Sequence, residues 1–130
     1  MLKFEDKVVI AIVGSRTFNN FSKFCNIVDS FVDKYREQYT HIEIISGGAR
    51  GTDKMASEYA GIRNIPFTEY KGNWVRDGGV AGFVRNSEIV SKCDKVIAFW
   101  NGRSSGTQDT IKKASSKNKL LHIELIKDEK

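Results

Sequence analysis

The chain has 130 residues, of which 40% are hydrophobic and 28% charged, and its formal net charge is +5. That length and composition predict one globular domain over residues 1–130 with a core of its own. They argue against a membrane-spanning protein, because no apolar run approaches the ~20 residues of a span. The basic excess suits an anionic ligand or weak nucleic-acid affinity, although a solvated lysine-rich surface explains it equally well.

The N-terminal segment and the cysteines set expectations about location and metals. Residues 1–7 are charged and run directly into an apolar strand, which argues against a signal peptide, so we expect a cytoplasmic protein. Cys25 and Cys93 lie in predicted helices and are expected to be small apolar fillers in a reducing compartment. No Cys/His cluster has metal-ligand spacing, so we predict no metal site and expect no cofactor.

Apolar segments of two kinds alternate along the chain. Val8–Val13 is a continuous, mostly β-branched run, typical of a strand buried on both faces, whereas Phe21–Tyr35 repeats apolar residues with helical period. The polar, glycine-rich segment Lys71–Gly79 is expected to be a loop. The expected strands are Lys7–Val13, Ile42–Ile45, Ile65–Tyr70, Lys95–Trp100 and Leu120–Ile126, and the expected helices are Phe21–Tyr35, Asp53–Ile62, Val80–Cys93 and Thr107–Lys117.

This alternation predicts an α/β fold with a doubly wound, parallel sheet of five strands in the order 3-2-1-4-5. In such sheets, ligands bind at the carboxyl ends of the strands, here near the switch point between strands 1 and 4. The phenylalanines at helical spacing are expected to be core residues: Phe21, Phe24, Phe31 and Phe83.

The segment Ser46–Asp53 carries three glycines and one arginine between a strand and a helix. Glycine lets the backbone approach a ligand closely, and a helix that starts after such a turn offers free N–H groups and a positive dipole end to an anion. In one interpretation, the backbone N–H groups of residues 47–51 therefore contact a phosphate. In the other, the turn only caps the helix through Thr52 or Asp53. The segment alone leaves both interpretations open.

Two further loops have the same chemistry. Gly14–Phe18 and Trp100–Thr107 follow strands 1 and 4, and each contains glycine, a hydroxyl residue and an arginine, as Ser46–Asp53 does. Because the three loops converge on the carboxyl edge of the sheet, they predict a ligand crevice there, which the pair Arg85-Asn86 faces from its helix. The predicted ligand-binding residues are Gly14, Ser15, Arg16, Gly47, Gly48, Arg50, Gly51, Thr52, Asp53, Arg85, Asn86, Trp100, Gly106 and Thr107.

Several of these residues also have a structural interpretation. Arg16 either clamps a phosphate or forms a surface salt bridge, and Ser15 either bonds the ligand or closes its turn. Arg50 points to ligand or to solvent. Arg85-Asn86 either face the crevice or belong to a solvated helix face, and Gly106-Thr107 either contact a phosphate or form a plain N-cap. Asp53 either accepts from a ribose hydroxyl or caps its own helix.

The two tryptophans are candidate stacking platforms for a base. Trp100, at the end of strand 4 and beside the predicted crevice, is the preferred candidate. Trp74 is expected to cover the edge of the core.

Gly14-Ser15-Arg16, Gly47–Asp53, Trp74, Ala81-Gly82, Arg85-Asn86 and Gly106-Thr107 occur in an order that resembles YspA-type proteins of the SLOG superfamily. The resemblance covers nearly the whole chain. The superfamily also includes the Lonely Guy phosphoribohydrolases and the DNA-processing protein DprA. It implies a Rossmann-like fold that binds nucleotides or nucleotide-derived ligands, often as a homodimer.

The hydrolase branch of the superfamily can be compared residue by residue. Arg85 matches its helix arginine, and Gly106-Thr107 match its Gly-Thr pair, but the position of its glutamate falls on Thr110. A hydroxyl cannot replace a carboxylate that stabilises cationic ribose character or acts as a base at neutral pH. We therefore favour a protein that is not an enzyme. In an enzyme, Arg85 would be catalytic and Asp53 or Glu88 would have to supply the carboxylate.

The resemblance implies a protein that binds an NAD- or ADP-ribose-related or cyclic-nucleotide ligand in order to sense or sequester it. Its setting would be defence or counter-defence in a bacterial cell or a phage-infected host, and its partners would be the small molecule and a second copy of the chain. Phosphoribohydrolase (N-glycosidase) activity on nucleoside phosphates is the first alternative. Single-stranded DNA binding is the second, and it ranks last because no basic-aromatic stripe supports it.

Overall fold

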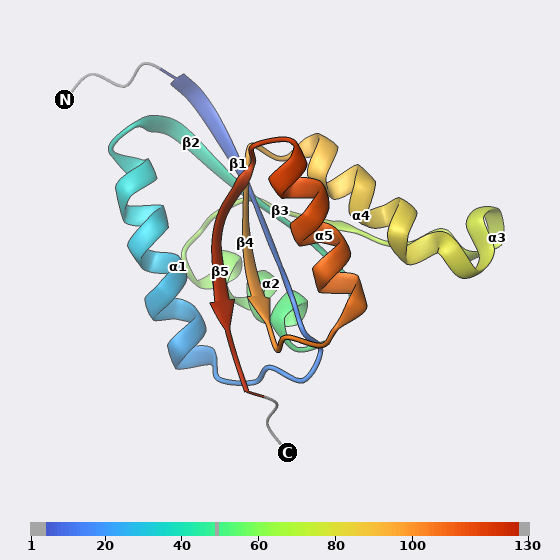
Figure 1. Ribbon diagram of the computed structural model, residues 1–130. Helices are drawn as coiled ribbons and strands as arrows, with labels where there is room; N and C mark the ends of the chain where they lie inside the picture. The colour runs from blue at the N-terminus through green and yellow to red at the C-terminus, as the bar shows by residue number, and fades with distance from the viewer. Residues whose placement is uncertain (1–4, 49, 128–130) are drawn as a thin grey trace.

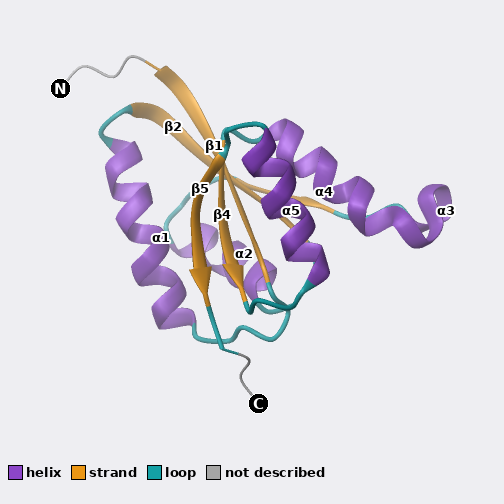
Figure 2. Cartoon of the chain, in the orientation of Figure 1, coloured by secondary structure: helices purple, strands orange, loops and turns teal. Residues whose placement is uncertain are grey.

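The computed structural model describes residues 5–48 and 50–127 and shows an α/β domain (Figures 1 and 2). Its central sheet has five parallel strands in the order β3-β2-β1-β4-β5, as predicted. The strands are β1 (Glu5–Gly14), β2 (Tyr39–Gly47), β3 (Phe67–Tyr70), β4 (Lys95–Trp100) and β5 (Leu120–Leu125); the helices are α1 (Phe21–Arg36), α2 (Thr52–Ile62), α3 (Trp74–Asp77), α4 (Ala81–Lys92) and α5 (Ser105–Ser116), with a 3-10 turn η1 (Gly78–Val80).

The central strand β1 shows why both faces of the sheet are covered. Its residues alternate between two cores, as the period of two requires: Val8, Ile10 and Ile12 join one cluster, and Ala11 and Val13 the other. The first cluster contains the apolar faces of α1 and α2, and the second contains those of α4 and α5. The helices therefore form one layer on each side of the sheet (Figure 1).

The prediction of a loop over Lys71–Gly79 is wrong, because the structure has α3 and η1 there. The side chain of Asn73 caps α3 by accepting a hydrogen bond from the Arg76 N–H (3.0 Å). A helix of four residues that buries none of its side chains has no hydrophobic period that sequence patterning could detect. Figure 1 shows α3 projecting from the body of the domain.

Boundaries of other elements differ slightly from the prediction. β3 starts at Phe67 and not at Ile65, although the carbonyl of Pro66 still accepts from Ile44 N (2.9 Å). α5 starts earlier than expected because Ser104, and not a residue of the Gly106-Thr107 pair, is its N-cap. Ends of elements carry the weakest pattern, so such shifts are expected.

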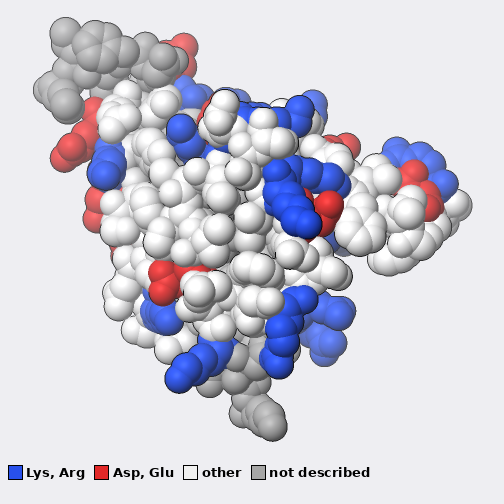
Figure 3. All heavy atoms as spheres, in the orientation of Figure 1, with Lys and Arg blue, Asp and Glu red and all other residues white. Residues whose placement is uncertain are grey.

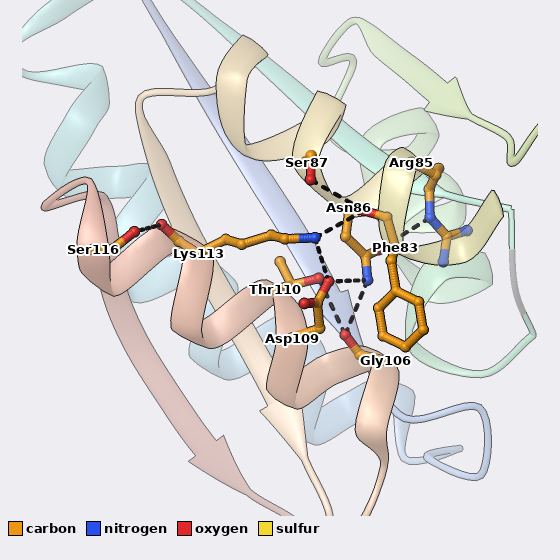
Figure 4. Close-up of polar contacts among 9 residues, drawn as sticks. All are labelled: Phe83, Arg85, Asn86, Ser87, Gly106, Asp109, Thr110, Lys113 and Ser116. Atoms are coloured by element: carbon orange, nitrogen blue, oxygen red, sulfur yellow. Dashed lines mark hydrogen bonds and ion pairs between the residues drawn. The ribbon is translucent and has the colours of Figure 1, made fainter. Parts of the chain in front are cut away.

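Three of the four phenylalanines expected in the core pack there. Phe24 is fully buried, and Phe21 and Phe31 pack against the same cluster. The prediction for Phe83 is wrong: it is 45% exposed, and its ring lies beside Lys113 of α5 (Figure 4). Helical spacing alone does not distinguish a core face from an unpaired apolar face.

The cysteines and the surface complete the description. Cys25 and Cys93 are both free thiols, and Cys93 is buried in the second core cluster.

Within the described residues, none of the helices combines the length and the apolar character needed to cross a membrane. Lys and Arg side chains are spread over the face drawn in Figure 3, along its upper edge as well as its lower edge.

Candidate functional site

A cavity of about 790 Å³ lies at the carboxyl edge of the sheet, where the loops after β1, β2, β3 and β4 meet α4 and the first turn of α5. Many of the predicted ligand-binding residues surround it: Gly14, Ser15, Arg16, Gly47, Gly48, Asp53, Arg85, Asn86, Gly106 and Thr107. Its volume lies within the usual range for small-molecule sites. The structure therefore has a cavity at the edge where ligands bind in doubly wound sheets.

The charged side chains around the cavity favour an anion. Arg16, Lys71 and Arg85 are its basic lining residues, and Asp53 is the one carboxylate among the described residues that line it. The first turn of α5 lines the same cavity with Ser105, Gly106 and Thr107, so the positive end of that helix dipole faces it.

The guanidinium of Arg85 lies directly over the end of β2. A Cβ atom built on Gly47 would be 2.7 Å from Arg85 Nη1 and 2.9 Å from Asp53 Oδ2. Glycine at position 47 therefore leaves room for both charged groups, and the arginine and the carboxylate are close neighbours above it.

Asp53 lies in the first turn of α2 and is only 6% exposed. Its Oδ1 accepts a hydrogen bond from Ser46 Oγ (3.0 Å), and Oδ2 faces Gly47. The N-cap of α2 is Gly51, so Asp53 is not the cap that the structural interpretation expected.

A polar network joins α4 to α5 beside the cavity (Figure 4). Asn86 Oδ1 accepts from Arg85 Nε (3.1 Å), and Asn86 Nδ2 donates to the Gly106 carbonyl (3.1 Å) and to Asp109 Oδ2 (3.2 Å). Lys113 Nζ pairs with the same Asp109 oxygen at 2.7 Å and donates to the Phe83 carbonyl at 2.8 Å. Asn86 is 4% exposed, so it holds Arg85 and the first turn of α5 together from a buried position.

This network also fixes the direction of Asp109, the acidic residue next to the position of the hydrolase glutamate. Thr110, at that position, lines the cavity, and its Oγ1 donates to the Gly106 carbonyl (3.3 Å). Asp109 is directed to Asn86 and Lys113 and is absent from the cavity lining, and Glu88 is exposed and also absent from it. Asp53 is therefore the carboxylate that remains for an enzymatic reaction in this cavity.

Gly51 and Thr52 of the glycine segment lie outside the cavity lining. The N–H and Oγ1 of buried Thr52 both donate to the carbonyl of Ser15, at 3.3 and 3.0 Å. Gly51 has φ +69°, and a Cβ there would be 2.4 Å from the Arg16 carbonyl oxygen. These two residues fasten α2 to the loop after β1, so packing alone explains them. The exposed Arg50 does not line the cavity either, and Ala49 lies outside the described residues.

The loop after β1 is held from three sides through Ser15. Its N–H donates to the Phe99 carbonyl (2.9 Å), its carbonyl receives Thr52, and its Oγ accepts from Asn101 N (3.2 Å). Gly14 is needed here for space, because a Cβ would lie 2.4 Å from the Phe99 carbonyl oxygen. Both residues border the cavity, and their contacts give the loop a fixed shape.

Neither tryptophan lies where the sequence suggested. Trp100 does not line the cavity; it is half-buried, and its Nε1 donates to the Ser104 carbonyl (3.0 Å). Trp74 is 66% exposed and does line the cavity, so it does not cover the core.

Sequence reasoning missed several lining residues. Lys71 and Gly72 follow β3, a strand whose loop was not among the three predicted to converge. Asn101 and Ser104 lie in a predicted loop but were not selected; Asn101 Oδ1 accepts from the N–H groups of Arg103 (2.9 Å) and Ser104 (2.8 Å). An Asn three residues before Ser is a recognisable turn signal. The described residues contain no group of three or more His, Cys, Asp or Glu side chains placed to hold a metal ion.

The fold and this cavity define a Rossmann-like α/β protein with a basic crevice at the carboxyl edge of its sheet. Residues 8–76 match the sequence model of the YspA, cpYpsA-related SLOG family. The chain is also similar to the Gene 61 protein of Mycobacterium phage D29, with 31% identity over 111 residues that cover 81% of this chain and 86% of that protein. The chain belongs to the YspA, cpYpsA-related SLOG family.

Proposed function

We propose that the protein binds a nucleotide-derived anion in the cavity at the carboxyl edge of the sheet, and that it senses or sequesters this ligand. The observation that carries the proposal is the composition of the cavity, in which Arg16, Lys71 and Arg85 accompany the positive end of α5. Membership of a SLOG family supports a nucleotide-related ligand. NAD- or ADP-ribose-related molecules and cyclic nucleotides are the first candidates, in the cytoplasm of a bacterial or phage-infected cell.

A thermal-shift screen of the purified protein tests this proposal. ADP-ribose, NAD, cyclic dinucleotides and nucleoside monophosphates are the compounds, with single-stranded DNA at low salt as a further arm. A ligand at one hundred times its dissociation constant adds ~2.7 kcal/mol of stability, which raises Tm by roughly 10 °C for a domain of this size. If none of the small molecules shifts Tm, the proposal is wrong.

Two arginine variants locate the site. Arg85→Ala should weaken binding by about 10–150-fold, because a hydrogen bond to a charged group contributes ~1.5–3 kcal/mol. Arg50→Ala is the matched control, since this arginine is exposed and lies outside the cavity lining. Equal losses in both variants would argue for nonspecific charge attraction.

The buried carboxylate of Asp53 beside Arg85 favours hydrolysis of an N-glycosidic bond as a second candidate. Such an enzyme would release free base from a nucleoside phosphate, with Asp53 stabilising the cationic ribose. Chromatography of every ligand recovered from the screen detects this reaction, and Asp53→Asn should abolish it. A ligand recovered intact leaves binding as the function.

We also propose that the protein forms a homodimer through the outer side of the segment from α3 to α4. Val75 is fully exposed there, and Val80, Phe83 and Val84 are 56%, 45% and 37% exposed. Contiguous exposed apolar surface is typical of interaction sites. Light scattering after size exclusion should give a dimer mass for the native chain and a monomer mass for Val75→Asp; a monomer mass for the native chain would overturn this proposal.

A further inference from the structure

We infer that Trp74 is the platform on which the base of the ligand stacks, so that the ligand lies with its base at the β3 end of the cavity. The inference rests on the proposed nucleotide site and deepens it. It names the protein side chain that contacts the base and gives the bound ligand an orientation in the cavity.

The first support is the exposure of Trp74 at the cavity wall. Its side chain is 66% exposed, although it lines the cavity together with Lys71, Gly82 and Arg85. Among the described residues, neither ring stacking nor a cation–π contact involves Trp74. A large ring presented at a cavity is therefore available to a planar ligand group.

The second support is that local structure orders the backbone that carries Trp74 without burying its ring. Asn73 caps α3 through Arg76 N (3.0 Å), and the Asp77 N–H donates to the Asn73 carbonyl (2.8 Å). The guanidinium of Arg76 forms two hydrogen bonds to Asp77, at 2.9 and 2.7 Å. The turn is thus ordered by its own polar contacts, while α3 buries none of its residues. A prearranged platform loses little entropy when a ligand binds.

The third support is that the other tryptophan is occupied elsewhere. Trp100 donates its Nε1 hydrogen to the Ser104 carbonyl and stays outside the cavity lining. None of the other described residues that line the cavity is aromatic. Trp74 is therefore the ring that a base in this cavity would meet.

The order of the strands then sets the direction of the ligand. Trp74 follows β3, whereas the first turn of α5 follows β4, three strand spacings away in the order β3-β2-β1-β4. At about 4.8 Å per spacing this separation is ~14 Å. Arg16 and the first turn of α5 would then bind phosphate at one end while the base stacks on Trp74 at the other.

Tryptophan fluorescence tests the inference directly, because the chain has only two tryptophans. In Trp100→Phe, Trp74 is the sole reporter. Titration with ADP-ribose or adenosine monophosphate should quench its emission, whereas ribose 5-phosphate, which has no base, should leave it unchanged.

Binding of the same probes, measured by calorimetry, completes the test. Trp74→Ala should weaken ADP-ribose binding by about 5–150-fold, equivalent to ~1–3 kcal/mol for one stacked base, and leave ribose 5-phosphate binding within twofold of wild type. Trp74→Phe should restore most of the loss, and Trp100→Phe serves as the matched control. ADP-ribose binding that Trp74→Ala leaves unchanged would overturn the stacking inference and keep the proposed function. Failure of these probes and of every small molecule in the thermal-shift screen to bind the wild-type protein would overturn both.

Discussion

Replacing Asn86 with alanine should destabilise the protein far more than a surface change, because its side chain makes three hydrogen bonds from a buried position. The partners are Arg85 Nε, the Gly106 carbonyl and Asp109 Oδ2, at 3.1, 3.1 and 3.2 Å, and Asn86 is 4% exposed. A hydrogen bond contributes ~1 kcal/mol net, so the expected loss is about 2–4 kcal/mol. For a domain of this size, Tm should fall by roughly 10 °C.

Urea denaturation followed by circular dichroism measures this loss as a change in midpoint at constant slope. Asp109→Asn is the matched variant: its side-chain oxygen can still accept from Asn86, and it loses only the partly exposed ion pair with Lys113. Such pairs contribute ~0.2–1 kcal/mol. If Asn86→Ala lost less than about 1 kcal/mol, or no more than Asp109→Asn, the network would not be what holds α4 against α5.

Further predictions concern the cavity floor, a surface ion pair and a buried thiol. Gly47→Ala would place a Cβ 2.7 Å from Arg85 Nη1 and 2.9 Å from Oδ2 of the buried Asp53. The guanidinium can swing away, so calorimetry should show ligand affinity falling by about tenfold or more. The carboxylate must shift as well, so urea denaturation should show a loss of about 1–3 kcal/mol. Hydrogen bonds from Arg63 (3.0 and 2.8 Å) lower the pKa of Asp29 below its ordinary 3.8. The stability that this group adds is therefore present above its ordinary pKa and is lost as pH falls through the lowered pKa. In urea titrations Asp29→Asn should destabilise more at pH 7 than at pH 2, and an equal effect at both would contradict this. Burial raises the pKa of the Cys93 thiol to about 11. In a Cys25→Ser background, a disulfide reagent at pH 8 should therefore react with the native protein roughly 100-fold or more slowly than with the unfolded chain. Similar rates in the two states would refute the burial of Cys93.

The topology could be predicted from the sequence because two strong signals agree. Continuous β-branched runs such as Val8–Val13 mark strands buried on both faces, and helical periods separate them. The right-handed crossover rule then restricts the strand order to very few arrangements. The predictions that failed concern local features. α3 is shorter than one hydrophobic repeat, and the period of Val80–Cys93 could not show that Phe83 stays largely exposed.

The general place of the cavity could also be predicted, because the carboxyl ends of parallel strands must share an edge. Which side chains point into it could not. Trp100 ends β4, but its ring turns to the Ser104 carbonyl, a contact that depends on the path of the following loop. Trp74 reaches the cavity from a segment that passes close to α4 at Gly72, where a Cβ would lie 3.3 Å from the Ala81 carbonyl oxygen.

The segment Ser46–Asp53 shows why a glycine-rich loop admits two interpretations. Its first part serves the cavity, since Gly47 leaves space for Arg85 and for the carboxylate of Asp53. Its second part serves the fold: Gly51 takes a positive φ against the Arg16 carbonyl. Residues that border the cavity and residues that hold the fold are thus neighbours in one loop, and the phosphate-cradle interpretation stays a prediction for the former. Both parts of the loop consist of the same kinds of residue. Their roles can therefore be told apart only by their distances to residues far away in the sequence.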